Sequence, residues 1–383
     1  THQKPLHSLL LCSLTDCRYH TRPKLSSNSI LYIRAIKAAV TKKKHLTQRQ
    51  QQRIADNASK RLRAPKNKGV ESVDDDSFAA TETGLILSRF GQHADVEDTS
   101  GVVVRCNMRR SVASLVTGDR VVWRRALQPT GGIDGVIDAV EERSSVLLRP
   151  DFYDGLKPVA ANIDLMIIVS AILPALSLNI IDRYLVAAEI TGIKPLLVIN
   201  KADLLSADEF LTTEQQLALY QQLGYNFLLV SAKSGVGMAQ LLSYLHSGTS
   251  IFVGQSGVGK SSLMNNLMPG LEALTQEVST NSGLGQHTTT VSRLYHLPDG
   301  GDLIDSPGIR EFALWHLTAE EVTRGFTEFT PWLGRCKFRD CKHISDPGCA
   351  IQHAVETGDI SQERYDSYLK ILASMAQDKP NHF

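Results

Sequence analysis

The sequence predicts a multidomain protein in which a small β-barrel precedes a parallel α/β domain and a helical, cysteine-bearing tail. Short alternating segments separated by turns over residues 82–150 predict the barrel. Apolar strands that alternate with amphipathic helices predict the α/β domain, and closely spaced cysteine and histidine residues mark the tail. With 383 residues, 42% of them hydrophobic, the chain is long enough to bury more than one core.

The first 81 residues are predicted to be an extension and a basic arm that are largely disordered. Lys42 to Lys68 contains ten Lys or Arg and one acid, Asp56, although the whole chain has 41 basic and 40 acidic residues. Such a segment suits phosphate backbones, and an inert charged tail is the alternative. Two interpretations of the first forty residues stay open: a translated upstream region with the start at Val40, or a poorly ordered extension.

Neither a membrane span nor a secretory signal is expected. No window approaches the roughly 18–20 consecutive apolar residues that span a bilayer. The apolar run at residues 6–14 is shorter, lacks a small-residue cleavage site behind it and is followed by basic sequence. We therefore expect a cytoplasmic protein with no membrane partner.

The predicted barrel occupies residues 82–155. Its strands are expected at GLILSRF, ADVED, VVVRCNM, DRVVWRR and GVIDAVEERSSVLLRP, with glycine-containing turns between them. Five short strands in this rhythm favour an oligonucleotide-binding (OB) barrel, whose arginines would suit nucleic acid. A barrel with a purely structural role is the alternative.

Residues 156–316 are predicted to form the α/β domain. Strands are expected at IDLMIIVSAI, KPLLVIN, FLLVSA and SIFV, and helices at NIIDRYLVAAEIT, TTEQQLALYQQLG, MAQLLSYLH and SSLMNNLMP. Continuous apolar strands of this kind are typical of a parallel sheet covered by helices on both faces. A further strand pair is expected around LYHLP and GDLID.

A phosphate-binding loop follows the strand SIFV and precedes a helix. In GQSGVGKSS, the glycines let backbone amides turn toward phosphate groups at the helix N-terminus. Lys260 would neutralise the β- and γ-phosphates, and Ser261 would bind Mg²⁺. The expected nucleotide contacts are Gly254, Gln255, Ser256, Gly257, Val258, Gly259, Lys260, Ser261 and Ser262.

Residues that could read a guanine base lie upstream of the phosphate loop, in the sequence NKAD. The carboxylate of Asp203 can accept hydrogen bonds from two donors of guanine, whereas adenine offers no such pair. Asn200 can bridge the base and neighbouring loops, and the stem of Lys201 can lie along the ring. The sequence SAK after the next strand adds an amide that could reach guanine O6. Its residues are Ser231, Ala232 and Lys233.

Two segments after the phosphate loop are expected to sense a γ-phosphate. In DSPG, Asp305 would hold Mg²⁺ through water and the amide of Gly308 would respond to the γ-phosphate. In NSGLGQHTTT, residues 281–290, Thr289 would complete the magnesium shell when triphosphate is bound. A solvated, threonine-rich loop is the alternative.

The tail, residues 317–383, is predicted to hold one structural zinc ion. The sequence CKFRDCKHISDPGC supplies three sulfurs and one imidazole, a closed four-ligand set with no open position for catalysis. Disulfides are the alternative and would suit an oxidising compartment. The predicted zinc ligands are Cys336, Cys341, His343 and Cys349, and the predicted magnesium ligands are Ser261, Thr289 and Asp305.

The motifs run in the order NKAD, SAK, phosphate loop, threonine switch and DSPG, which is a cyclic rotation of the usual GTPase order. With the barrel before them and the cysteines after them, the chain resembles the circularly permuted RsgA (YjeQ) family of small-subunit-dependent GTPases over about residues 41–378. The resemblance implies an N-terminal OB-fold barrel, a central circularly permuted P-loop GTPase domain and a C-terminal helical zinc-binding domain.

The resemblance also implies a function and partners. The expected activity is GTP hydrolysis by a monomer that binds the small (30S) ribosomal subunit and its rRNA, acts in late maturation and is stimulated by the subunit. GTP and GDP are the expected nucleotides, with Mg²⁺ as cofactor.

The catalytic set depends on a departure from many GTPases. These place a water-orienting Gln after DSPG, but Ile309 occupies that position here. The resemblance assigns water positioning to His287, with Thr289 and Lys260 completing the set; a structural role for His287 stays open. An RNA-binding scaffold that holds GTP as a structural ligand with negligible turnover is therefore the alternative function.

Overall fold

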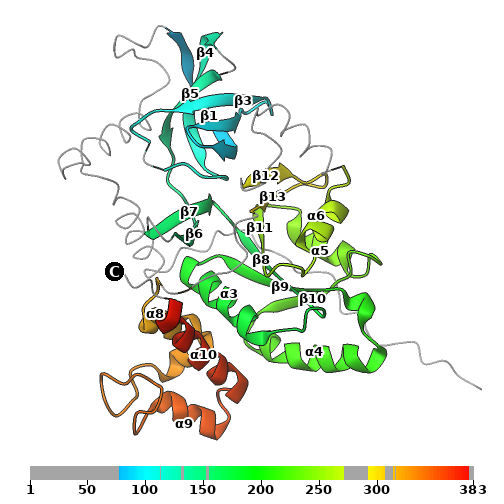
Figure 1. Ribbon diagram of the computed structural model, residues 1–383, viewed down its shortest axis with the longest axis vertical. Coiled ribbons are helices and arrows are strands. Elements are labelled where there is room, and N and C mark those ends of the chain that lie inside the picture. The colour runs from blue at the N-terminus through cyan, green and yellow to red at the C-terminus, as the bar shows by residue number, and fades with distance from the viewer. Residues whose placement is uncertain are drawn as a thin grey trace, which may run out of the picture.

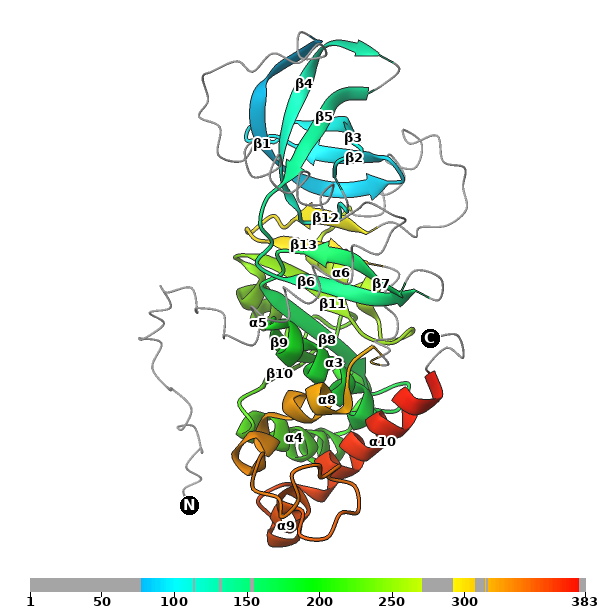
Figure 2. The ribbon, with the colours of Figure 1, turned by 90° about the vertical axis from the view of Figure 1, so that its left-hand side faces the viewer.

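The computed structural model describes residues 77–112, 114–130, 133–151, 155–270, 292–306, 314 and 316–378. The barrel lies at one end of the molecule, the α/β domain in the middle and the C-terminal helices at the other end (Figures 1 and 2). The basic arm, His287, Thr289, Gly308 and Ile309 lie outside the described residues. Within the described ranges, no helix combines the length and apolar character needed to cross a membrane.

The N-terminal barrel closes on itself with the strand order β1-β2-β3-β5-β4 and a further β1–β4 pairing. β3 and β5 run parallel, while the other neighbours are antiparallel. Trp123, Ile86 and Ile137 fill the interior and are completely buried. The predicted OB-like barrel is thus confirmed. Its strands are β1 (Phe78–Phe90), β2 (His93–Glu97), β3 (Val103–Met108), β4 (Arg120–Thr130) and β5 (Ile133–Val140).

The sequence GVIDAVEERSSVLLRP, expected to be one barrel strand, forms two strands, so this prediction was wrong. β5 ends at Val140, and β6 (Val146–Asp151) pairs with β7 (Gly155–Ala161) in a separate two-stranded sheet. The polar residues between them turn the chain. Arg143 there donates to both carboxylate oxygens of the buried Asp119, at 2.6 and 2.8 Å. This pairing of distant residues has no local sequence signal.

The central sheet has the parallel order β10-β9-β8-β11-β13, and the antiparallel β12 extends it. Neighbouring residues of β8 point to opposite faces: Ile168 packs with residues of α3 and α4, whereas Ile167 packs with residues of α5 and α6. Helices therefore cover both faces, as predicted. The elements are β8 (Leu165–Ala171), α3 (Leu178–Thr191), β9 (Lys194–Asn200), η2 (Ala202–Leu204), α4 (Ala207–Gln222), β10 (Asn226–Leu229), α5 (Met238–Leu245), β11 (Thr249–Val253), α6 (Lys260–Leu267), β12 (Arg293–His296) and β13 (Asp302–Asp305).

The chain order of this sheet explains how motifs far apart in sequence meet. β8, β9 and β10 precede β11 in the chain, yet β8 pairs directly with β11. Parallel strands place their carboxyl ends at the same edge, where ligands bind in open α/β sheets. The carboxyl ends of β9, β10, β11 and β13 therefore lie at one edge.

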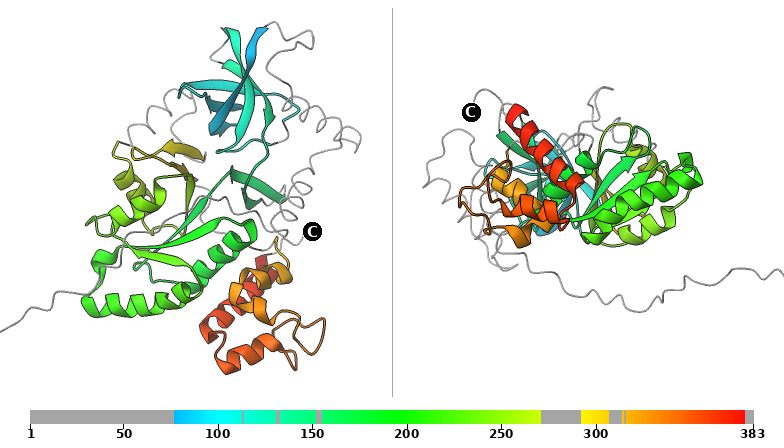
Figure 3. Two further views of the ribbon diagram at one scale, coloured as in Figure 1. Left: turned by 180° about the vertical axis from the view of Figure 1, so that it is seen from behind. Right: turned by 90° about the horizontal axis from the view of Figure 1, so that it is seen from below.

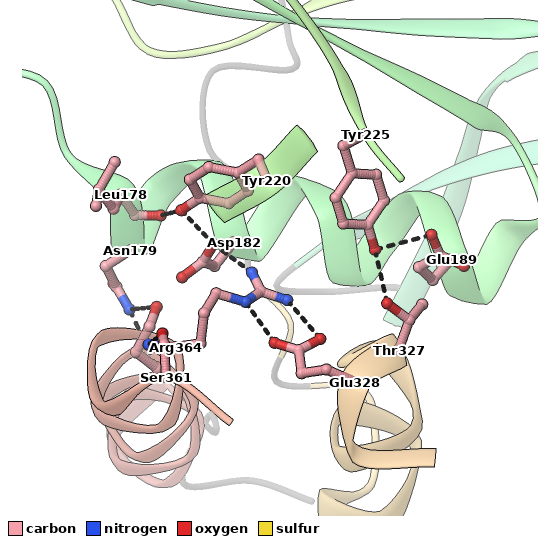
Figure 4. Close-up of polar contacts among 11 residues, drawn as sticks. Leu178, Asn179, Asp182, Glu189, Tyr220, Tyr225, Thr327, Glu328, Ser361 and Arg364 are labelled. Carbon is pink, nitrogen blue, oxygen red and sulfur yellow. Dashed lines mark hydrogen bonds and ion pairs between the residues drawn. The ribbon is translucent and has the colours of Figure 1, made fainter. Parts of the chain in front are cut away.

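The C-terminal domain packs against α3 of the central domain (Figure 3). One hydrophobic core runs from α3 into this domain and includes Phe326, Phe329 and Tyr368. The two domains also share buried polar contacts, which centre on Arg364 (Figure 4). The elements are α8 (Ala319–Gly325), η3 (Thr327–Trp332), α9 (Ala350–Thr357) and α10 (Gln362–Asp378).

The barrel joins the central domain through β1, which pairs with β12 at Ser88 and Arg293. Beside this pairing, His296 Nε2 lies 2.8 Å from Glu97 of the barrel. The turn at Gly118 packs against the end of β7. A Cβ at Gly118, whose φ is +85°, would lie 2.3 Å from the Ala161 carbonyl oxygen, so only glycine allows this close approach.

Candidate functional site

The loop between β11 and α6 is shaped by glycines that pack against neighbouring backbone. A Cβ at Gly254, whose φ is +142°, would lie 2.1 Å from the Val169 carbonyl oxygen. A Cβ at Gly259, whose φ is +92°, would lie 2.3 Å from Asn200 Nδ2. Residues with larger side chains would push this loop away from β8 and β9, so the glycines fix its path.

The far end of this loop brings charged and hydroxyl groups together. Lys260 Nζ donates to the carbonyl oxygens of Gly254 and Gln255, both at 2.6 Å. Burial raises the pKa of Asp305, at the end of β13, and the charge of Lys260 acts against that rise. Ser261 and Ser262 lie exposed in the first turn of α6. A cation, a carboxylate and a hydroxyl around a helix N-terminus suit a phosphate group with a magnesium ion.

Asn200 joins this loop to the loop after β10. Its Nδ2 donates to the Val258 carbonyl oxygen at 2.9 Å, and its Oδ1 accepts from the Ala232 amide at 3.2 Å. Only 2% of Asn200 is exposed, so these contacts satisfy an otherwise buried amide. Three strand-end loops are thereby held in one arrangement.

Lys201 adopts a conformation that is uncommon for residues other than glycine. Its φ is +64°, in the left-handed region. From there its Nζ donates to the carbonyl oxygens of Gly257, at 2.8 Å, and Leu173, at 2.5 Å. Such backbone strain is found most often where the surrounding structure holds a functional group in place.

Asp203 and the SAK residues lie on the other side of Asn200. Asp203 Oδ1 accepts a hydrogen bond from Ser231 Oγ at 2.6 Å, and Ser231 Oγ in turn accepts from the Ser234 amide at 3.1 Å. Asp203 and Lys233 are exposed, whereas Ser231 is buried. The carboxylate is therefore held from behind while it stays accessible to a ligand.

One residue that holds these loops together could not be identified from the sequence. Asn266 of α6 donates through Nδ2 to the Ala232 carbonyl oxygen at 2.9 Å, which fixes the SAK loop on the phosphate-loop helix. The two residues are 34 positions apart, so no local pattern could have indicated the contact. The predicted residues His287, Thr289 and Gly308 lie outside the described residues, so this geometry does not include them.

The tail contains a cluster that can hold a metal ion: Cys336, Cys341, His343 and Cys349. Their ligand atoms all lie within 4.8 Å of one another. His343 Nδ1 lies 3.5 Å from the sulfurs of both Cys336 and Cys349, and the Ala350 amide donates to Cys336 Sγ at 3.4 Å. All three cysteines are free thiols.

The environment of this cluster fits a metal better than free thiols. Burial raises the pKa of Cys341 to about 12 and also raises the pKa of Cys349. Burial lowers the pKa of His343, against the charge of Asp346, which keeps the imidazole neutral and able to bind metal. Thiols this close together, one buried and two partly buried, gain most from a cation that replaces their protons.

Sequence comparison places these features in a known family. The family model for RsgA GTPase matches residues 140–315. The small ribosomal subunit biogenesis GTPase RsgA 1 of Vibrio vulnificus (strain YJ016) is 58% identical over 343 residues, which cover 89% of this chain and 97% of that protein. Its counterpart named RsgA in Haemophilus influenzae (strain 86-028NP) is 56% identical over 342 residues, covering 89% and 99% of the two chains.

Solved structures agree with this result. The crystal structure of YjeQ from Thermotoga maritima has a TM-score of 0.62 and 32% identity, and covers 77% of this chain and 99% of its own. The circularly permuted GTPase YloQ has a TM-score of 0.60 and 28% identity, and covers 82% and 100%. With the barrel, the rotated order of its motifs and the C-terminal cysteine cluster all in place, this chain belongs to the RsgA family of circularly permuted GTPases.

Proposed function

We propose that this GTPase binds the small (30S) ribosomal subunit and its rRNA, acts in late maturation of the subunit and is stimulated by it. Two relatives at 58% and 56% identity, each covered almost completely, are named small ribosomal subunit biogenesis GTPases. The basic arm, the arginines of the barrel and the basic residues around the cysteine cluster would supply contacts to phosphate backbones. A cytoplasmic monomer is the form in which such a factor would act.

The contacts of Asn200 are the main observation in support of a guanine-nucleotide site. One buried side chain ties the phosphate loop, through Val258, to the loop that holds Ala232. Binding of one nucleotide across both loops therefore needs little rearrangement. Asp203 would accept hydrogen bonds from guanine, the Lys201 stem would lie along the ring, and the residues of SAK would complete the base pocket.

Within the catalytic site, the chain's residues position phosphate and water. The amides from Gly254 to Ser262 would surround the phosphates, and Lys260 would leave its carbonyl partners to contact the β- and γ-oxygens. Ser261, Asp305 and Thr289 would hold Mg²⁺, which when bound neutralises oxygens of the β- and γ-phosphates. The Gly308 amide would respond to the γ-phosphate, and His287 would orient the attacking water.

The cysteine cluster would hold one structural zinc ion. Three sulfurs and one imidazole are the ligands that tetrahedral zinc prefers, and they leave no open position for a reacting water. The ion would stabilise the C-terminal domain, which packs on α3 through α8 and α10.

Phosphate release, measured with and without purified small subunits, tests the proposal. We expect slow turnover by the isolated protein because the Gly- and Thr-rich segment at 281–290 must be ordered first. Subunits should raise the rate, and this stimulation should fall steeply with added salt because the contacts are to phosphate. Equal rates with and without subunits would contradict the activation step and favour the scaffold alternative.

Two variants separate binding from chemistry in that assay. His287→Ala should lose the stimulated rate and keep GTP-dependent binding to the subunit. Lys260→Ala should lose nucleotide affinity itself, and with it GTP-dependent binding. If His287→Ala is stimulated normally, another group positions the water.

A further inference from the structure

A cavity of about 180 Å³ lies where the barrel, the β6–β7 hairpin and the central domain meet. Arg89 of β1 and the barrel turn at Thr117 form one side of it. Arg149 and Lys157 of the hairpin form another, and Ser292 and Ser306 belong to the central domain. The cavity is thus lined by three parts of the molecule, and none of the residues proposed to bind nucleotide lines it.

Cationic side chains dominate the lining of this cavity. Arg89, Arg149 and Lys157 contribute three positive charges, and no Asp or Glu is among the described residues that line it. Arg149 and Lys157 face each other as a pair in the β6–β7 register. Side chains of directly paired residues lie on the same face of the hairpin, so both cations lie where one anion would interact with them.

Arg89 has no carboxylate bonded to it in the described part of the chain. Its Nη1 donates to the Leu115 carbonyl oxygen at 2.8 Å and its Nε to the Gly91 carbonyl oxygen at 3.1 Å. The nearby carboxylate of Asp119 already accepts both hydrogen bonds from Arg143. Burial lowers the pKa of Arg89, and the charge of Asp119 acts against that shift. A half-buried guanidinium in this situation is stabilised by an anion.

Hydroxyl groups complete the lining and connect it to the DSPG strand. Ser292 Oγ and Ser306 Oγ lie 2.8 Å apart, and Thr117 Oγ1 donates to the Ser292 carbonyl oxygen at 2.8 Å. Ser306 directly follows Asp305, the proposed magnesium ligand. Hydroxyls can turn their protons toward an anion, whereas they are indifferent to an apolar ligand.

We propose that this cavity binds a phosphate group, held by Arg89, Arg149 and Lys157 at a site separate from the nucleotide site. Arginine forks match the oxygens of phosphate, and several cations from different elements suit its charge better than that of a single carboxylate. The volume admits a phosphate or pyrophosphate together with water. The bound group would hold the barrel against the strand that leads into DSPG.

Pyrophosphate is a suitable probe, titrated by calorimetry into the full-length protein saturated with Mg²⁺ and GDP, so that the phosphate loop is already filled. We expect saturable binding to the parent protein. Arg149→Gln should weaken it by about tenfold, the loss of one charge-assisted contact, and Arg89→Gln should do the same. Arg120→Gln is the matched control, because Arg120 is exposed on barrel strand β4 and does not line the cavity.

Two results would overturn the site: no saturable binding up to about 10 mM pyrophosphate, or equal affinity in the parent and Arg149→Gln proteins. Arg149 is exposed, and its side chain has no hydrogen bond to another described residue, so its variant should fold normally. A single-stranded RNA hexamer, added as competitor, identifies the source of the phosphate. If the RNA displaces pyrophosphate from the parent protein and this displacement requires Arg149, the natural ligand is the backbone of a nucleic acid. If the RNA does not displace pyrophosphate, the natural ligand is a small phosphorylated molecule. Both results support the cavity as a phosphate site.

Discussion

Arg364 on helix α10 is ion-paired with Asp182 on helix α3, and no more than 2% of either side chain is exposed (Figure 4). Glu328 binds the same guanidinium through two hydrogen bonds, at 2.6 and 3.2 Å. Tyr220, at the end of α4, donates to Asp182 at 2.7 Å. These contacts fix the C-terminal domain to α3 and α4, the helices that precede and follow the proposed base-reading strand β9 in the chain.

Arg364→Ala should destabilise the protein strongly. Removal of the guanidinium leaves Asp182 and Glu328 buried without a cation, and breaking such a pair costs about 3–5 kcal/mol of folding free energy. Urea unfolding, followed by the fluorescence of Trp332 in a background without the other tryptophans, measures the effect in the C-terminal domain. Arg324→Ala, which removes an exposed pair with Glu320, should change stability by less than about 1 kcal/mol. Similar losses in both variants would contradict this account of the interface.

Gly259→Ala should weaken GDP binding. The new Cβ would meet Asn200 Nδ2 and push apart the phosphate loop and the base-reading loop. Gly270→Ala is the matched control, because Gly270 also has a positive φ, +97°, but no atom lies within 4 Å of the place that its Cβ would take. Both variants should lose about 1 kcal/mol of stability from the backbone alone, and only the first should lose nucleotide affinity in a fluorescent-GDP titration. Unchanged affinity in Gly259→Ala would show that Asn200 can move without consequence.

The junction of the barrel and the central domain should depend on pH through His296. Burial lowers the pKa of His296, but hydrogen bonds and charges from Asp302 and Glu97 outweigh burial and raise it overall. A raised pKa in the folded state stabilises the fold fully at pH values below the unfolded pKa of about 6.5, and this contribution is lost as pH rises through the folded pKa. Because 49% of the side chain is exposed, the effect should be small.

Thermal unfolding of the parent and His296→Gln proteins at several pH values measures this contribution. The difference in midpoint should be largest near pH 6 and shrink toward pH 9, where the histidine is neutral in both states. A difference that is constant with pH would mean that His296 acts through packing alone.

Metal removal should loosen the C-terminal domain and spare the nucleotide site. Purified protein should carry one equivalent of zinc, and Cys341→Ser should lower its zinc content and expose the tail to proteolysis, because three ligands bind the ion less tightly. Asp340→Asn is the control, since Asp340 is exposed beside the cluster and is not one of its ligands. Absence of metal from carefully purified protein would rule out the zinc assignment, and loss of GDP affinity in Cys341→Ser would contradict the independence of the two sites.

Base selectivity should follow from Asp203. In Asp203→Asn the amide can donate a hydrogen bond where the carboxylate only accepts, so GTP affinity should fall by about tenfold or more while xanthosine triphosphate gains. Asp208→Asn, an exposed change in the first turn of α4, should alter neither. Competition binding with the two nucleotides measures the outcome, and unchanged preference for GTP would remove the guanine assignment.

Local sequence signals account for most of the central fold. Strands β8 to β11 and helices α3 to α6 form where apolar runs and amphipathic periods predicted them, because each segment buries a continuous apolar face. The strand predicted across residues 135–150 was wrong, since the turn there depends on Arg143 reaching Asp119, 24 residues away. Local periodicity carries no information about such a pair.

Some residues of the candidate site could be predicted from local sequence, and others could not. Gly254, Lys260, Asp203 and the cysteine spacing were identifiable because nucleotide and metal chemistry require certain residue types at short, fixed distances along the chain. Asn266 was missed because its partner, Ala232, lies in the loop after β10, and only the folded sheet brings that loop to α6.

By itself, the sequence determined the family, the kind of fold and the chemistry of each motif, because these depend on neighbouring residues. Only the tertiary structure decided how the motifs are joined: Asn200 to Val258, Arg364 to Asp182, and three cations around a cavity between the domains. Those contacts link segments separated by 58 and 182 residues in the first two cases. The residues in each contact meet only when the strands, helices and domains pack together. No pattern of neighbouring residues in the sequence indicates which distant residue will be the partner.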